Sequence, residues 1–257
     1  MTGCWDNDKL FANREEIIRI SNNCAQCHEY CCRFLGAAGS LTSDTYRIAL
    51  DCVNTQKLSG YCSRLAAKEL KPLKSARGTE KIRFLSAVTN KGVVAFTETA
   101  KKLCDRIYLI ADEYGAVSRL LLHSIRSAAL ENGYDIISCY CPLGPFDKLE
   151  QMFIPSLKLG FMTSNRYHDF TMDITPYRII HYQRFTDNDK FKASKKRVSF
   201  NRKAAAQMID QAEQLLRDAH KLHDELEGYY IGAMDFEKVD ALTQSVIQTV
   251  DRVKSFA

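Results

Sequence analysis

The chain has 257 residues, a net charge of +5 and 46% hydrophobic residues, which is typical of a globular protein with one large domain or a domain with an appendage. This small positive charge does not by itself indicate nucleic-acid binding. No apolar run approaches the roughly 18–20 residues of a membrane span, and the first residues do not resemble a signal peptide, so we expect a cytoplasmic protein.

Apolar spacing predicts three helices in the N-terminal part. Residues 13–36 carry apolar side chains every three or four positions, and Gly36 and Gly39 are expected to end this helix. A second helix, capped by Thr42-Ser43-Asp44, would reach about residue 53, and a third would span residues 55–70. The basic, broken stretch that follows is the expected boundary of this helical segment.

The pattern then changes to short apolar runs separated by turns. Strands are expected at residues 82–88, 92–96, 106–111, 134–141, 152–155, 159–163 and 177–183. A short helix should follow the second strand, and a longer one, stopped by Asn132-Gly133, should lie between the third and the fourth. The segment CPLGPFDKLEQ contains two prolines and a glycine, so it is predicted to be a loop at the rim of the sheet.

After Asp187 the chain is predicted to be helical to its end, with a break at Gly228 or Gly232. Because both ends carry apolar helix faces that need partners, we expect them to pack together. The sequence thus predicts an α/β protein with a P-loop NTPase-like parallel-sheet core and helical N- and C-terminal segments packed together. Its expected parts are a helical segment (1–80), an α/β core (81–187) and C-terminal helices (188–257).

The loop after the third strand lies where such sheets bind the phosphates of a nucleotide. A Walker A loop, G-x-x-x-x-G-K-[ST], needs two glycines for the backbone to wrap the phosphates, a lysine to neutralise them and a hydroxyl for magnesium. This chain has Asp112, Val117, Ser118 and Arg119 at those positions, and none of them matches. Gly115 remains inside the loop. We therefore predict a degenerate phosphate loop formed by Asp112, Glu113, Tyr114, Gly115, Ala116, Val117, Ser118 and Arg119.

Some residues of this loop leave nucleotide binding open as an alternative. Ser118 and Arg119 could still meet an anion beside the helix amides, and Tyr114 could stack on a base. Asp173 and Glu150, the second placed on the rim loop, are weak candidates for a Walker B carboxylate. Without a clear carboxylate we do not expect ATP hydrolysis. We expect no cofactor, and the alternative is ATP with magnesium.

Several stretches resemble a poorly characterised family of bacterial P-loop ATPase-like proteins, which usually carry two tandem P-loop domains. The similar stretches are FLSAVTNKGVVAF, DRIYLIADEYGAVSRLLL, IPSLKLGFMTSN and AHKLHDELEGYYIGAMDF. The chain is similar to the second domain of that family and the helical segment before it, over most of residues 30–257. The resemblance implies the P-loop fold, but the family's phosphate loop is the place where this chain departs.

The ten cysteines are numerous, and four of them form the motif CAQCHEYCC. Cys24, Cys27, Cys31 and Cys32 have the number for a zinc site, and Cys24-x-x-Cys27-His28 matches a haem attachment pattern. However, positions 24, 27 and 31 continue the apolar stripe of the helix, where free cysteine packs as a small hydrophobe. We predict a structural role and no bound metal, with a zinc or redox site as the alternative.

Two charged clusters near the C-terminus are interpreted in the same way. His220, His223 and Glu227 could share one helix face as a metal or acid–base cluster, but we favour a structural role at a charged helix end. The basic run around Phe200 could contact phosphates, but it is typical of a solvated helix start. Its members are Lys192, Lys195, Lys196, Arg197, Arg202 and Lys203.

These observations lead to three hypotheses for function. The first is a pseudo-NTPase that acts as a scaffold or interaction module for a protein partner. It would bind neither a membrane nor nucleic acid. A homo-oligomer is compatible with its apolar faces. The second is a divergent nucleotide-binding ATPase or kinase-like enzyme. The third is a cysteine-cluster zinc or redox protein.

Overall fold

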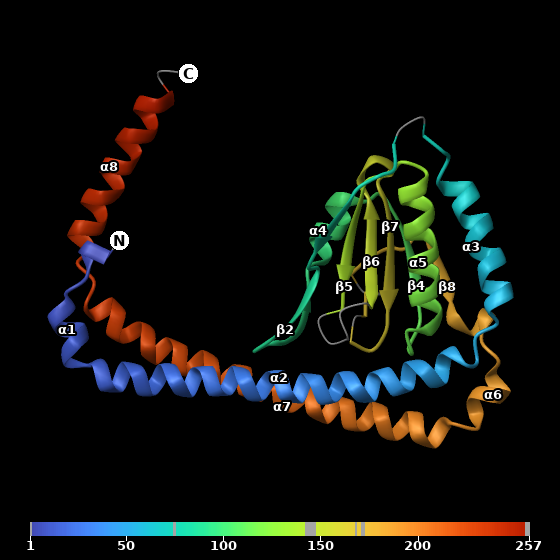
Figure 1. Cartoon of the computed structure of the whole chain (residues 1–257), viewed down its shortest axis with the longest axis horizontal. Helices are drawn as coiled ribbons and strands as arrows, with labels where there is room; N and C mark the ends of the chain where they lie inside the picture. Colours follow the sequence, from blue (N-terminus) through green and yellow to red (C-terminus); the bar gives the residue numbers. More distant parts are fainter. Residues whose placement is uncertain (1, 74–75, 142–147, 168, 171–172, 255–257) are drawn as a thin grey trace. The chain divides into compact units, whose positions relative to one another are not determined.

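The computed structural model describes residues 2–73, 76–141, 148–167, 169–170 and 173–254 (Figure 1). The α-helices are α1 (Asn7–Ala12), α2 (Arg14–Leu50), α3 (Thr55–Glu69), α4 (Thr97–Leu103), α5 (Ala116–Glu131), α6 (Asn188–Lys192), α7 (Lys195–Gly232) and α8 (Phe236–Lys254). The strands are β1 (Glu80–Arg83), β2 (Ser86–Thr89), β3 (Gly92–Ala95), β4 (Arg106–Ala111), β5 (Ile136–Tyr140), β6 (Leu149–Ile154), β7 (Leu159–Ser164) and β8 (Arg178–His181). Short 3-10 helices cover Thr2–Cys4, Pro155–Leu157 and Tyr182–Phe185.

By its internal contacts the chain divides into two compact units. One consists of Met1–Cys31 and Gln214–Ala257, and the other is Cys32–Glu213, which contains all of the strands. The long helices α2 and α7 contribute residues to both units. Within the described residues, no helix combines the length and the apolar character that crossing a bilayer requires.

Six strands form one mixed sheet in the order β1-β5-β6-β7-β4-β8, and β2 and β3 form a separate hairpin. The expectation of a parallel sheet is correct for most neighbours, but β6 runs antiparallel to both β5 and β7. The reason is the length of the connections, because a parallel neighbour needs a crossover of a dozen or more residues. The links from β5 to β6 and from β6 to β7 are shorter than that. The expected strand 82–88 is also divided between β1 and β2.

Helices cover both faces of this sheet (Figure 1). On one face α5 and α3 pack on the sheet around Tyr108, Leu121 and Phe161, which are fully buried. On the other face α4 packs around Leu109 and Phe153. Every residue of β6 and β7 is buried, as expected for central strands with a layer on each face.

The predicted pairing of the terminal helices is observed as the packing of α2 against α7. In the strand-containing unit, Ala38 lies against Ala205 and Ile209, and Asp44 forms an ion pair with Arg197 and accepts a hydrogen bond from Asn201. In the other unit, the Cys24 thiol lies 3.6 Å from the carbonyl oxygen of Ala219.

The predicted end of the first helix at Gly36 and Gly39 is wrong, since α2 continues unbroken to Leu50. The hydroxyl of Thr42, which was expected to cap a second helix, instead donates to the carbonyl four residues earlier, and the hydroxyl of Ser40 does the same. Each interior glycine costs a helix about 1 kcal/mol relative to alanine, and burial of neighbouring Ala38 against α7 offsets that cost.

Candidate functional site

The loop between β4 and α5 lies at the carboxyl ends of β4 and β7. The amide of Asp112 donates to the carbonyl of Ser164, the last residue of β7, over 3.0 Å. In open α/β sheets this edge is where ligands bind, because loops and helix N-termini converge there. The predicted strand, loop and helix are confirmed, with β4 at Arg106–Ala111 and α5 beginning at Ala116.

The side chain of Asp112 occupies the position in this loop where an anion would bind. Its Oδ1 accepts hydrogen bonds from the amides of Tyr114 (3.1 Å) and Gly115 (3.0 Å), and its Oδ2 accepts one from the amide of Ser118 (2.7 Å). Gly115 has a φ of 77°, the left-handed conformation that turns the chain into α5. The carboxylate is 2% exposed. The amides and helix dipole that would attract a phosphate are thus engaged by the protein's own anion.

A cation whose side chain is only 16% exposed lies beside the same loop. The Lys148 ammonium forms an ion pair with Glu150, whose side chain is fully buried, and a Cβ on Gly115 would lie 3.4 Å from the Lys148 nitrogen. Burial favours a lower pKa for Lys148, but the nearby charges of Glu150, Cys141 and Asp112 together hold this pKa well above its usual range. Asp112 and Lys148 therefore place a negative and a positive charge where a nucleotide site would hold a phosphate and its counter-charge.

The placement of Glu150 in a rim loop was wrong. Residue 149 already belongs to β6, and the strand register between β5 and β6 shifts at Cys139–Tyr140, so Glu150 is the extra residue of a β-bulge. The prolines and glycine of this segment suggested a longer loop, of which residues 142–147 lie outside the described part. Lys148 was not predicted as a site residue. The position of Lys148 two residues before Glu150 is the signal in the sequence for their ion pair.

The other predicted loop residues mostly contact protein groups. Glu113 pairs with Arg202 of α7, and the Arg119 guanidinium lies 4.7 Å from the ring centre of Tyr46. The ring of Tyr114 packs against Tyr182 and Phe191, so it makes aromatic contacts within the protein. The next three residues are buried at the start of α5, namely Ala116, Val117 and Ser118.

A polar cleft of about 400 Å³ opens next to this loop. It is lined by Ala111, Asp112, Glu113, Ser164, Asn165, Arg166, Asp169, Tyr182 and Gln183. Three carboxylates and one arginine give it a negative balance, which does not favour a polyphosphate.

The chain was compared with protein-family models, curated proteins and solved structures. None of them matches. The resemblance to P-loop ATPase-like proteins therefore remains an expectation from the sequence. Function is inferred from the residues of the chain itself.

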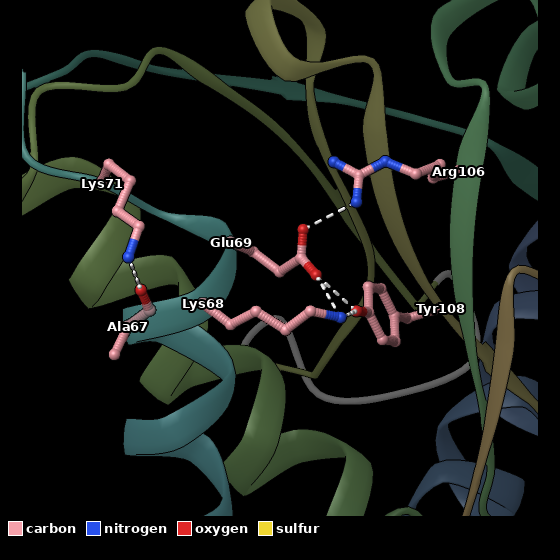
Figure 2. A network of polar contacts seen from close by, with 6 residues as sticks. All are labelled: Ala67, Lys68, Glu69, Lys71, Arg106 and Tyr108. Atoms are coloured by element: carbon pink, nitrogen blue, oxygen red, sulfur yellow. Dashed lines mark hydrogen bonds and ion pairs between the residues drawn. The ribbon is translucent and has the colours of Figure 1, made fainter.

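A second polar cluster lies at the opposite end of β4 (Figure 2). The buried carboxylate of Glu69, the last residue of α3, accepts hydrogen bonds from Tyr108 (2.7 Å) and Arg106 (2.8 Å), and Lys68 lies 3.1 Å away. Burial acts to raise the pKa of Glu69, but the hydrogen bonds from Tyr108, Lys68 and Arg106 outweigh it and lower this pKa. The sequence analysis missed this network, which joins α3 to the sheet, because its partners are far apart in sequence.

The cysteine and histidine clusters are the other candidate metal sites. Among the described residues, three ligand atoms lie within 4.8 Å of one another at His223, Asp224 and Glu227, all exposed, and Cys24, Cys27 and Cys31 form no such group. The expected neighbour His220 pairs with Asp224 at 3.7 Å, while His223 pairs with Glu227 at 3.4 Å. Pairs of this kind are common on exposed helices, so they give no independent sign of a metal.

Three cations of the basic run have acidic partners. Lys192 pairs with Asp189, Arg197 with Asp44, and Arg202 with Glu113. Their charge is therefore partly neutralised by the fold, which weakens the case for a phosphate-binding surface.

Proposed function

We propose that this protein is a pseudo-NTPase, a P-loop-like α/β protein that acts as an interaction module and does not convert a nucleotide. The observation that carries the proposal is the Asp112 carboxylate, which accepts the amide hydrogens of Tyr114, Gly115 and Ser118. A phosphate would have to displace this carboxylate from the helix N-terminus. It would also have to break the Lys148–Glu150 ion pair to obtain a lysine.

The interaction part of the proposal is supported by α8. Its described side chains from Asp240 to Arg252 are all exposed, and they include four large apolar residues on a helix of 19 residues. These are Leu242 (40% exposed), Val246 (54%), Ile247 (48%) and Val250 (45%). Large apolar residues that gather on an exposed helix are typical of a surface that binds another protein.

The test is the binding of Mg-ATP to the wild-type protein and to Asp112→Gly, measured by isothermal titration calorimetry. We expect no saturable binding to the wild type below about 1 mM, which corresponds to roughly 4 kcal/mol of binding free energy. In Asp112→Gly the three amides lose their anion, so measurable affinity for ATP or inorganic phosphate should appear. Restoring the whole Walker A loop is a poorer test, because Val117 and Ser118 are each only 1% exposed.

The matched control is Asp105→Gly. Asp105 precedes β4 at the other end of the strand and has an exposed side chain, so its loss should not create an anion site. Micromolar binding of ATP to the wild type that does not change in Asp112→Gly would contradict the proposal.

The second candidate function is a divergent nucleotide-binding protein that uses the neighbouring cleft. The favouring observation is the 400 Å³ volume beside the loop, with Arg166 and the Tyr182 side chain on its wall. In that case ATP would bind the wild type, and Arg166→Ala would weaken binding at least about tenfold, a loss of about 1.4 kcal/mol. Asp105→Gly, which lies outside the cleft lining, would leave it intact.

A further inference from the structure

The strand β1 forms one edge of the six-stranded sheet. It pairs with β5, and in the described part of the chain no strand pairs with its other side. The amide of Ile136 donates to the carbonyl of Thr79 over 2.9 Å, so the backbone groups of Thr79 face β5. Because these groups alternate along a parallel ladder, those of Glu80 and Ile82 face outward. The carbonyl of Ile82 accepts a hydrogen bond of 2.7 Å from the side chain of the adjacent Arg83.

Large apolar side chains accompany these outward backbone groups. Ile82 is 57% exposed and Phe84 is 81% exposed. Phe96, 58% exposed, is held nearby because its amide donates to the carbonyl of Leu85 over 2.8 Å. β1 is short and three of its four residues are charged, which disfavours unspecific pairing of sheet edges, while the exposed apolar side chains offer contacts to a strand of matching chemistry.

The charges on this edge indicate the chemistry of the added strand. Lys81 and Arg83 have exposed side chains on the face of the sheet opposite to that of Ile82. A second copy of β1, added antiparallel with Ile82 opposite its equivalent, would place Lys81 opposite Arg83 of that copy. Like charges in this position are destabilising, so self-association is disfavoured. Acidic residues opposite Lys81 and Arg83 would instead be stabilising.

We infer that β1 is a docking site for an extended peptide segment of a partner protein, in which apolar residues alternate with acidic ones. The apolar residues would pack on Ile82, Phe84 and Phe96, and the acidic ones would pair with Lys81 and Arg83. Backbone hydrogen bonds to Ile82 would supply affinity independent of side chains. This inference rests on the interaction half of the proposed function and is independent of the closed phosphate loop.

The test starts from a displayed library of random peptides about ten residues long, selected on the wild-type protein. Selected peptides are then measured by fluorescence polarisation against Ile82→Pro. Proline removes the outward N–H of Ile82 without removing a hydrogen bond to β5. We expect the selected peptides to alternate apolar and acidic residues and to bind Ile82→Pro at least about tenfold more weakly.

The control is Ile179→Pro in β8, the opposite edge strand of the same sheet. The amides of Arg106 and Asp112 donate to carbonyls beside or in β7, so Ile107 and Leu109 face β8, and with Tyr108 opposite Arg178 the N–H of Ile179 faces outward. This variant should bind the peptides as the wild type does, and thermal unfolding should show that both proline variants are folded. If Ile82→Pro fails to fold, amide hydrogen exchange of the wild type replaces it, and peptide binding must slow exchange at Ile82.

The charge prediction is tested with Lys81→Glu/Arg83→Glu, which should shift the selected peptides from acidic to basic residues. Failure to select any peptide, equal binding to Ile82→Pro and wild type, or unchanged exchange at Ile82 would each overturn the inference. Such a failure is distinguishable from failure of the proposed function, which shows as tight binding of Mg-ATP to the wild type.

Discussion

The carboxylate of Asp112 accepts a 2.7 Å hydrogen bond from the amide of Ser118, six residues further along the chain. This bond ties the first turn of α5 to the end of β4. A charge-assisted hydrogen bond at a helix N-terminus is stronger than one between neutral groups, so the Asp112 carboxylate stabilises the loop whose amides it engages.

The first prediction concerns this contact. Asp112→Ala should lower the free energy of unfolding by about 2 kcal/mol, because it removes a helix cap and leaves three amides without their acceptor. Urea unfolding followed by circular dichroism measures the change. Asp105→Ala is the control and should cause little change, since that side chain is exposed. An Asp112→Ala protein as stable as the wild type would show that the carboxylate is not a structural cap.

The second prediction concerns Lys148 and Glu150. Lys148→Met should destabilise the protein by about 3–5 kcal/mol, because it leaves the fully buried Glu150 carboxylate without a counter-charge. The double variant Lys148→Met/Glu150→Gln should recover most of that loss, since no buried charge remains. Urea unfolding of both single variants and the double variant gives the coupling energy. Additive effects of the two substitutions would argue against a direct ion pair.

The third prediction is a pH dependence that originates at Glu69. Its pKa is lowered in the folded protein, so its carboxylate contributes stability above its unfolded pKa of about 4.3. That contribution is lost as pH falls through the lower folded pKa. The stability difference between the wild type and Glu69→Gln should therefore shrink as pH falls from about 5 to 3.

Urea unfolding at each pH measures this difference. Glu98→Gln is the matched control, because Glu98 has an exposed ion pair with Lys101. A difference in unfolding free energy between the wild type and Glu69→Gln that stays constant down to pH 3 would show that the pH dependence does not originate at Glu69.

The fourth prediction concerns the ten cysteines, all of which are described and present as thiols rather than disulfides. Cys32 is the exposed one and should react fastest with 5,5′-dithiobis(2-nitrobenzoate), and Cys32→Ser should remove that fast phase. Burial raises the pKa of Cys104 to about 12 and that of Cys139 to about 11, so these thiols should react slowly below pH 9. Protein purified without a metal-binding tag should contain well under one zinc per chain by elemental analysis.

The fifth prediction separates the packed from the exposed apolar residues of the smaller unit. Leu242→Ser and Val246→Ser in α8 should change the unfolding midpoint little, because both side chains are largely exposed. Ile20→Ala in α2 should lower the unfolding free energy by about 2–5 kcal/mol, because Ile20 is fully buried. A large loss of stability in the α8 variants would mean that this helix packs on another part of the chain.

The sequence predicts the centre of the fold well and its long-range polar contacts poorly. The apolar run of β4 and the periodic leucines of α5 locate the loop, because local patterns determine both elements. The bulge at Glu150 interrupts the regular alternation of a strand, so the start of β6 could not be inferred, and the spacing of Lys148 and Glu150 was the only sign of their ion pair. Likewise, Glu69 and Arg106 are 37 residues apart, and only the folded chain brings them together.

The strand order has a consequence for how the chain assembles. β4 lies between β7 and β8, and both of these neighbours come later in the sequence. During synthesis from the N-terminus, the apolar residues of β4 therefore leave the ribosome well before either pairing partner exists. The six-stranded sheet cannot be completed until about residue 181 has emerged, so shorter nascent chains expose β4 without its later neighbours, and an unpaired apolar strand is prone to aggregation.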